Sequence, residues 1–408
     1  MASNPRLRVL MACQRFFPYT AGAELQALGL ARALTVLGAD VQVVTTRFTN
    51  QLAARETLEG IPVRRLSTVR LPTGSTTAAG AVAAALAQAS CLGAMMLYIA
   101  RRARPFDVVH AHCLSSTALG AAVGAHLAGV PVIVKPSLGG VEGELQRMVT
   151  SRAARQLLAL VRRIDRFAVT NAAIADELYA VGVAPEKLAR VQNGVDLERF
   201  RPLAAAARAH ERGRLGLPGG PLAIFVGQLV PRKGVVPLLE AWRGVRSGLP
   251  GATLVFVGHG ELSARVEREA ATSDSGVIAL GLRRDVAGLM RVADLLVLPS
   301  RNESFGNVIA EALASGIPVV CGRTGLAEMV ALDGLAGRFV DPHDPRSIGR
   351  ALVEILGSPD RGAALGARGP ALVQRFDFHA IAREYLGIYD LMCNAARVGS
   401  GAVSVAGG

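Results

Sequence analysis

The sequence has little lysine and few aromatic residues. Of its 45 basic side chains only three are lysines (Lys135, Lys187 and Lys233), and aromatic residues make up 4% of the chain. The net charge of +13 invites an anionic partner, but the basic residues are dispersed and few aromatics are present to stack on bases. The composition therefore argues against a nucleic-acid-binding protein and leaves peripheral attraction to an anionic membrane open.

Several patterned motifs are also absent. The five cysteines form no C-x-x-C pair, which predicts reduced thiols in a cytoplasmic protein rather than disulfides or a zinc site. No D-x-D occurs, so we expect no metal site, and no G-x-G-x-x-G follows the first strand-like segment, which disfavours a dinucleotide-dependent oxidoreductase. The uncharged run over 78–100 is rich in alanine and contains Gln88 and Ser90. It predicts a buried or interfacial helix rather than a membrane span.

What the sequence does contain is an alternation of short apolar segments with helical lengths, which occurs twice. The pattern predicts an α/β protein with two doubly wound, Rossmann-like domains facing each other across a cleft, where ligands meet the carboxyl ends of the strands. An Ala/Arg-rich stretch after "NGVDLERFRP" reads as the linker. We expect an N-terminal domain over 1–200 and a C-terminal domain over 201–375. A last helix over 376–395 should cross back to the N-terminal domain, and residues 396–408 should form a disordered tail.

The stretch "ESFGNVIAE" places two carboxylates, Glu303 and Glu311, around a tight turn at the start of a predicted helix with Asn307 as its expected cap. The free amides of a helix N-terminus bind anions, and carboxylates accept hydrogen bonds from sugar hydroxyls. The combination suits a nucleotide sugar. The alternative, that Glu303 only favours a helix N-terminus and Glu311 is a solvated helix residue, stays open.

Two further segments carry candidate chemistry. In "GQLVPRKG", Arg232 and Lys233 would place positive charge where a diphosphate leaves, unless they are a solvated loop pair; a lysine in so arginine-rich a chain favours the functional interpretation. In "DVVHAH", His110 and His112 point to the same side of a strand. Either a neutral histidine bonds a sugar or leaving group, or His110 in particular is a structural residue.

With these segments in view, the chain resembles the retaining glycosyltransferases of family 4, which have the GT-B fold. "ESFGNVIAE" matches the E-x7-E signature of that family, and "FFPYTAGAE", "DVVHAH", "NGVDLERF" and "PRKG" appear in its usual order. The resemblance spans about residues 7–392. It implies transfer of a sugar from a nucleoside-diphosphate sugar, the co-substrate, to an acceptor glycan or lipid, without metal or other cofactor, in the cytoplasm or at the inner face of the membrane.

The resemblance also implies roles for single residues. The expected catalytic residues are His112, Lys233 and Glu303. Gly22 would face the donor phosphates, and Glu311 would hold the ribose. The expected donor-binding set is completed by Arg232, Lys233, Glu303, Phe305, Gly306 and Asn307.

The chain departs from the family pattern at two positions. Gln228 stands where many members have arginine, and Ala21-Gly22 stands where two glycines are usual. A nucleotide-sugar epimerase of similar build and a non-catalytic nucleotide-sugar-binding subunit remain alternatives.

Overall fold

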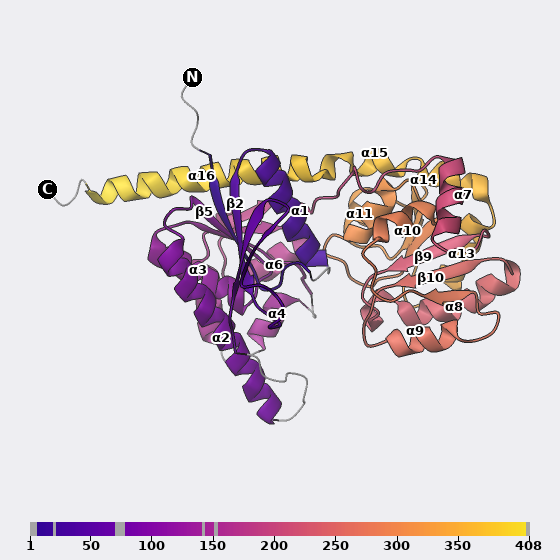
Figure 1. Ribbon diagram of the computed structural model, residues 1–408, viewed down its shortest axis with the longest axis horizontal. Helices are drawn as coiled ribbons and strands as arrows, with labels where there is room; N and C mark the ends of the chain where they lie inside the picture. The colour runs from indigo at the N-terminus through magenta and orange to yellow at the C-terminus, as the bar shows by residue number, and fades with distance from the viewer. Residues whose placement is uncertain (1–5, 19–21, 70–77, 141–142, 151–153, 405–408) are drawn as a thin grey trace, which may run out of the picture. The chain divides into compact units, whose positions relative to one another are not determined.

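The computed structural model describes residues 6–18, 22–69, 78–140, 143–150 and 154–404, and the chain forms two compact units (Figure 1). Unit 1 contains residues 1–194 and 378–408, and unit 2 contains residues 195–377. Each unit is a doubly wound α/β body with one sheet.

The sheet of unit 1 has the strand order β3-β4-β2-β1-β5-β6-β7-β8. All neighbouring strands are parallel except β3 and β4, which form an antiparallel pair. The order reverses between β1 and β5, which makes that pair the topological switch point. The strands are β1 Arg8–Cys13, β2 Asp40–Thr46, β3 Arg55–Leu58, β4 Ile61–Leu66, β5 Val108–His112, β6 Val132–Lys135, β7 Arg166–Val169 and β8 Leu188–Arg190.

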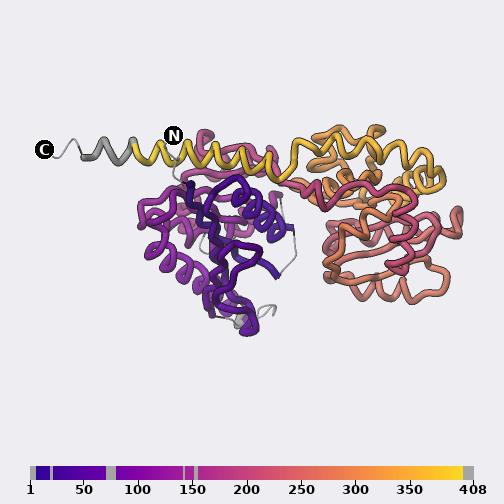
Figure 2. Tube along the Cα trace, turned by 45° about the horizontal axis from the view of Figure 1, so that its top comes forward, coloured from indigo at the N-terminus to yellow at the C-terminus, as the bar shows by residue number. Residues whose placement is uncertain are grey.

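Helices cover both faces of this sheet. On one face α1 packs beside α16, whose Tyr385 and Tyr389 are fully buried, and on the other α2 packs tightly on α3 (Figure 2). A Cβ on Gly120 of α3 would lie 2.2 Å from the carbonyl oxygen of Leu92 in α2, so glycine is required for this close approach. The helices are α1 Gly22–Val36, α2 Ala78–Arg102, α3 Ser116–Ala128, α4 Glu144–Val149, α5 Ala154–Arg163, α6 Ala172–Ala180, the 3-10 turn η1 Pro185–Lys187 and α16 Phe378–Ser404.

Unit 2 repeats the architecture with the order β11-β10-β9-β12-β13-β14, all parallel, and its switch point lies between β9 and β12. The strands are β9 Leu222–Val226, β10 Thr253–Val257, β11 Val277–Ala279, β12 Leu295–Leu298, β13 Val319–Cys321 and β14 Gly337–Phe339. The helices are α7 Ala205–Arg214, η2 Pro231–Lys233, α8 Val235–Gly248, α9 Ser263–Ala270, α10 Val286–Val292, α11 Asn307–Ala314, α12 Leu326–Met329, α13 Pro345–Leu356, α14 Pro359–Gly366, α15 Gly369–Val373 and η3 Gln374–Phe376.

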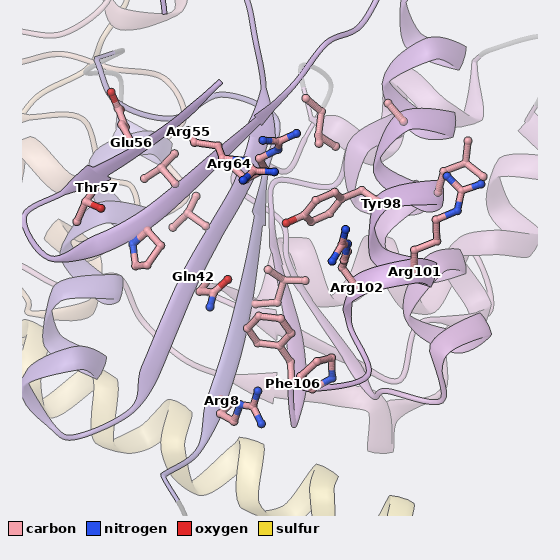
Figure 3. Close-up of a pocket in the computed structure, with 18 of the residues that line it drawn as sticks. Arg8, Gln42, Arg55, Glu56, Thr57, Arg64, Tyr98, Arg101, Arg102 and Phe106 are labelled. Atoms are coloured by element: carbon pink, nitrogen blue, oxygen red, sulfur yellow. The ribbon is translucent and has the colours of Figure 1, made fainter. Parts of the chain in front are cut away.

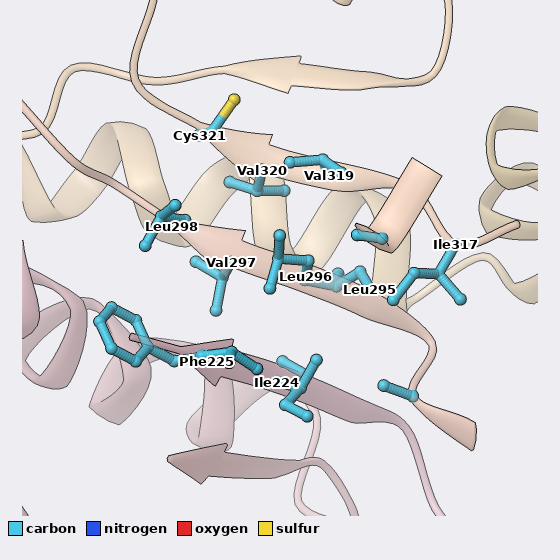
Figure 4. Close-up of a cluster of buried hydrophobic side chains, with 14 of the residues drawn as sticks. Ile224, Phe225, Leu295, Leu296, Val297, Leu298, Ile317, Val319, Val320 and Cys321 are labelled. Atoms are coloured by element: carbon cyan, nitrogen blue, oxygen red, sulfur yellow. The ribbon is translucent and has the colours of Figure 1, made fainter. Parts of the chain in front are cut away.

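The central strands of unit 2 are apolar along their whole length, because helices cover both faces. Figure 4 shows their side chains, including Phe225, Leu296 and Val320, packed on both sides of the sheet. This core fixes where the loops after β9, β12 and β13 begin, and those loops carry most of the predicted site residues.

Two expectations were wrong. The Ala/Arg-rich stretch taken as a linker forms helix α7, because alanine and arginine are strong helix formers and Arg212 anchors it to Asp294 and the carbonyl of Val292. The tail expected to be disordered from residue 396 is helical to Ser404, since no proline interrupts α16.

The uncharged run predicted as a buried or interfacial helix is α2. Its stretch Gly80–Arg102 is long and apolar enough to cross a membrane by length and composition, and 11% of its most apolar window is buried. Its carboxyl-terminal half enters the core of unit 1 through Met95 and Ile99, while Val82 and Leu86 are exposed.

Candidate functional site

The loops after β9 and β12, the two strands at the switch point of unit 2, bring Lys233 and Glu303 together. Lys233 ends η2, Glu303 follows β12, and the ammonium of Lys233 forms an ion pair with Oε1 of Glu303. Their side chains are only 12% and 10% exposed. We predicted that Lys233 contacts the diphosphate and Glu303 the sugar. In the structure the two charges pair with each other, at the position where ligands bind in such sheets.

The backbone holds the lysine loop against the end of β12. Gly234 has φ 72°, and a Cβ there would lie 2.1 Å from the carbonyl oxygen of Pro299, so only glycine fits. The amide of Arg301 donates to the carbonyl of Arg232 over 2.9 Å. Nη2 of Arg232 lies 3.4 Å from Oε1 of Gln228, so the side chains of these two residues contact each other within the loop after β9.

The Glu303 loop is braced by residues that the sequence analysis did not single out. The amide of Glu303 donates to Oγ1 of Thr324 over 2.9 Å, and that hydroxyl donates back to the carbonyl of Glu303 over 3.1 Å. Gly325 has φ 59°, and a Cβ there would lie 2.5 Å from the carbonyl oxygen of Phe305. The Phe305 ring is buried in the core, so its side chain anchors the loop and leaves only its main chain to meet a ligand.

The helix after this loop begins one residue earlier than expected. Gly306 is the N-cap of α11, with φ 88° and ψ 62°, and Asn307 is the first helical residue. The prediction of Asn307 as cap is therefore wrong. Glycine takes the cap position because it adopts a left-handed conformation without strain.

Glu311 lies in α11, is partly buried, and is close enough to Asp196 and Arg199 of "NGVDLERF" to feel their charges. Burial raises the pKa of its carboxyl to about 8, while the nearby charge of Arg199 lowers it and that of Asp196 raises it. Near neutral pH this shift favours the protonated carboxyl.

The glycine-containing turn "VGHGEL" over 257–262, which follows β10, has a packing role. Gly258 has φ 142°, and a Cβ there would lie 1.8 Å from the carbonyl oxygen of Gly227; a Cβ on Gly260 would lie 2.5 Å from that of Leu229. These glycines let the loop after β10 lie against the lysine loop. This accounts for their presence without a ligand.

In unit 1 the predicted residues also lie at a switch point. His112 ends β5, and Gly22, after β1, is the first residue of α1. Strands β1 and β5 are neighbours, with Cys13 opposite His112. Residue 21, where the sequence departs from the usual two glycines, lies outside the described residues.

His110 and His112 point to the same face of the sheet, as predicted, and their rings stack with centroids 4.4 Å apart. Nδ1 of His110 lies 2.6 Å from the hydroxyl of Tyr389 in α16, and the ring is fully buried, so His110 is a structural residue. Among the described residues, Nε2 of His112 has no hydrogen-bond partner. Burial, with the nearby Lys135, lowers the pKa of His112 to about 3, so its imidazole is neutral.

Two polar side chains at this end of the sheet were missed. Lys135 pairs in register with His112 on the neighbouring strand, and burial lowers its pKa to about 7. Oε2 of Glu144 accepts from the amides of Leu114 and Ser137 and thereby ties together the loops after β5 and β6. Glu144 holds these loops across a long sequence separation, which no local pattern reveals.

The described part of the chain contains no group of three or more His, Cys, Asp or Glu side chains arranged to hold a metal ion.

Comparison with known families gives matches in both units. Residues 21–194 match the glycosyl transferase 4-like domain, and residues 220–358 match the model described as glycosyl transferases group 1. A curated relative from Thermobispora bispora, named D-inositol 3-phosphate glycosyltransferase, is 30% identical over 90% of this chain and 89% of its own length. A protein of the same name from Jonesia denitrificans is 29% identical over 98% and 99% of the two chains.

Solved structures share the fold. Anabaena HepE, crystallised with UDP and glucose, superposes with a TM-score of 0.73 at 21% identity, over 94% of this chain and 100% of that one. Sucrose-phosphate synthase from Thermosynechococcus elongatus gives a TM-score of 0.74 at 21% identity, over 96% and 100% of the two chains.

Proposed function

This chain belongs to family 4 of the GT-B glycosyltransferases, and from that premise we propose that it takes its sugar from a uridine diphosphate sugar held at the β9–β12 switch point of unit 2. The family reaction moves the sugar to an acceptor hydroxyl with retention of configuration. The Lys233–Glu303 pair carries the proposal, because it puts a fixed cation and a sugar-binding carboxylate side by side.

Departure of the diphosphate leaves negative charge on its oxygens. We assign Lys233, Arg232 and the amides of Phe305 and Gly306 at the start of α11 to those oxygens, since preorganised donors act most strongly in a desolvated site. Glu303 accepts from sugar hydroxyls, and Glu311 from the ribose. The anomeric carbon gains oxocarbenium character, and a front-face attack by the acceptor restores the original configuration without a covalent enzyme intermediate.

In unit 1, we assign Gly22 to the donor phosphates and His112 to the transferred sugar. The imidazole of His112 is neutral, so it can accept or donate one hydrogen bond without placing charge beside a cationic transition state. The acceptor is proposed to be a hydroxyl compound that bears phosphate, because the curated relatives are named for D-inositol 3-phosphate. A glycan or a lipid-linked acceptor would enter the same reaction.

The proposed setting is the cytoplasm, with peripheral contact to anionic membrane at its inner face. The net charge of +13 and the exposed Val82 and Leu86 of α2 support this contact. We propose that transfer requires no metal, so turnover should survive EDTA. Loss of turnover restored by Mg²⁺ or Mn²⁺ would contradict this.

Thermal unfolding with nucleotides tests the donor assignment. UDP at a hundred times its dissociation constant should stabilise the protein by about 2.7 kcal/mol, which for domains of this size raises the melting temperature by several degrees, at about 2–4 °C per kcal/mol. NAD should give no shift. The variant Lys233→Ala should lose the UDP shift, whereas Lys187→Ala, whose ammonium bonds main-chain carbonyls of unit 1, should keep it. A shift with NAD alone would overturn the proposal.

A further inference from the structure

Unit 1 contains a groove of about 1050 Å³ between one face of its sheet and α2 (Figure 3). Its lining combines apolar side chains with a concentration of guanidinium groups. Five arginines line it: Arg8, Arg55, Arg64, Arg101 and Arg102. We call this the arginine groove.

The arginine groove lies on the opposite face of the sheet from His112. Leu10 and Val109 are register partners on the face that α2 covers, whereas the next pair, Met11 and His110, points to the face of α16. His112 follows His110 by two residues and shares its face. The groove is therefore separate from the candidate site in unit 1, and it does not rest on the donor assignment in unit 2.

Like charges face each other inside the groove. Arg55 of β3 and Arg64 of β4 are directly opposite in the antiparallel pair, so their side chains lie on one face. Like charges in this position destabilise a sheet. Glu56 also lines the groove, but its side chain alternates to the other face of the sheet, where its carboxylate is bound to the buried Arg65 at 2.6 Å. Within the described chain, neither Arg55 nor Arg64 forms an ion pair.

The opposite wall adds further cations and an apolar surface. Figure 3 shows Tyr98 and Arg102 of α2 pointing toward the sheet, with Phe106 below them. Leu97, 48% exposed, also lines the groove, and the exposed apolar side chains of Val82 and Leu86 lie on the same helix. Guanidinium groups bind phosphate oxygens in a bidentate manner, and the apolar wall can cover a hydrocarbon chain.

We propose that the arginine groove binds a phosphate ester that carries an apolar chain. The phosphate lies between Arg55 and Arg64 and is approached by Arg102 from α2, and the apolar chain lies along Leu97. The ligand relieves the repulsion of the opposed arginines. This explains why the sheet keeps a like-charged pair on this face.

The test uses the full-length protein with dihexanoyl phosphatidic acid below its micelle concentration, glycerol 3-phosphate, and phosphatidylcholine vesicles with and without phosphatidic acid. The double variant Arg55→Gln/Arg64→Gln should bind dihexanoyl phosphatidic acid about 30-fold more weakly than the wild type, or about fivefold for each arginine. The control Arg346→Gln/Arg350→Gln removes two exposed arginines of α13 in unit 2 and should bind like the wild type.

Melting temperatures report whether the variants fold. The groove variant should melt at or above the wild-type temperature, because a repulsive pair is gone. If glycerol 3-phosphate competes as well as dihexanoyl phosphatidic acid, the apolar chain contributes nothing to binding and the proposed ligand is wrong. If only the amphiphile and the acidic vesicles bind, and Leu97→Ser weakens both, the site takes lipid. Equal loss of binding in the groove and control variants would show that net charge alone is responsible and would overturn the site, as would the absence of binding by every probe.

Discussion

The two units have similar sheet topologies, but their candidate sites differ in the charge of the side chains that they contain. Each places its candidate residues after the two strands that flank a switch point, β1 and β5 in unit 1 and β9 and β12 in unit 2. In unit 2 the groups are charged and paired, Lys233 with Glu303. In unit 1 burial keeps His112 neutral and lowers the pKa of Lys135 to about 7. We call these the charged site and, after the neutral imidazole of His112, the neutral site. A charged pair suits the leaving diphosphate, and a neutral imidazole suits a reaction partner that is a hydroxyl.

The largest expected effect tests the charged site. Lys233→Ala should reduce turnover by about 100- to 1,000-fold at saturating donor, because one preorganised donor to a developing anion is lost. Glu303→Ala should have a loss of similar size. Steady-state kinetics with the UDP sugar that stabilises the protein most would measure both. Lys187→Ala serves as the matched lysine control.

The double variant Lys233→Ala/Glu303→Ala sharpens this test. If the two residues contact different parts of the donor, the double variant should lose more turnover than either single variant, although their ion pair makes the two effects less than fully additive. If they matter only as an ion pair that shapes the loops, the second substitution should add little to the first. Near-normal turnover in either single variant would remove that residue from the proposed machinery.

A pH series on stability tests the neutral site. The pKa of Lys135 is about 7 in the folded chain, whereas the ordinary value of a lysine, taken for the unfolded chain, is 10.5. Between pH 7 and 10.5 the unfolded state therefore binds more protons than the folded state, and the free energy of unfolding rises with pH. The slope from this group approaches about 1.4 kcal/mol per pH unit. The cost of burying the charged amine is present in full below pH 7. Lys135→Met should remove this contribution.

Urea unfolding of the wild type and of Lys135→Met between pH 7 and 10 would measure the free energy of unfolding of each protein. The difference between the two curves isolates Lys135, because the contributions of the other titrating groups cancel. A parallel pair of curves would mean that Lys135 reaches solvent or gains a partner. The comparison between a neutral and a charged site would then fail for unit 1.

The sequence revealed the charged site better than the neutral one for a physical reason. Lys233 and Glu303 follow apolar strands directly, and the carboxyl ends of parallel strands share one edge of a sheet, so local position predicted their neighbourhood. Thr324 and Glu144 act through hydrogen bonds to residues distant in sequence, which no local pattern encodes. The opposition of Arg55 and Arg64 depends on the antiparallel register of β3 and β4, two strands that the alternation did not predict.

The fold shows the same division. The alternation of apolar segments predicted two doubly wound domains, because a strand that is buried on both faces is apolar along its whole length. The helix α7 was missed because its position depends on Arg212 reaching Asp294, far along the chain.

A smaller effect concerns proton linkage at Glu311. Its carboxyl has a pKa of about 8 in the free protein, so a ligand that needs the ionised form as acceptor must first displace a proton at pH 7. The affinity for UDP should therefore rise by about tenfold between pH 7 and 9, at about 1.4 kcal/mol per pKa unit. Calorimetry in buffers of different ionisation enthalpy would detect the released proton. Glu311→Gln should remove the pH dependence, and a flat profile in the wild type would exclude the ribose role.

The smallest expected effect separates positioning from chemistry at the charged site. Thr324→Val keeps the side-chain shape but removes the hydroxyl that accepts from the amide of Glu303 and donates to its carbonyl. Each of these two bonds should contribute about 1 kcal/mol to the unfolding free energy, and a loop displaced at a cost of about 1 kcal/mol should lower turnover about fivefold. The effect should appear in kcat more than in KM for the donor, because the carboxylate remains present but is less well placed.

Thr272→Val, which removes an exposed hydroxyl bonded to the carbonyl of Arg268, is the matched control. If both variants lose stability equally and neither changes kcat, Thr324 only supports the fold; if Thr324→Val lowers kcat while Thr272→Val does not, the brace positions Glu303 for the transfer step.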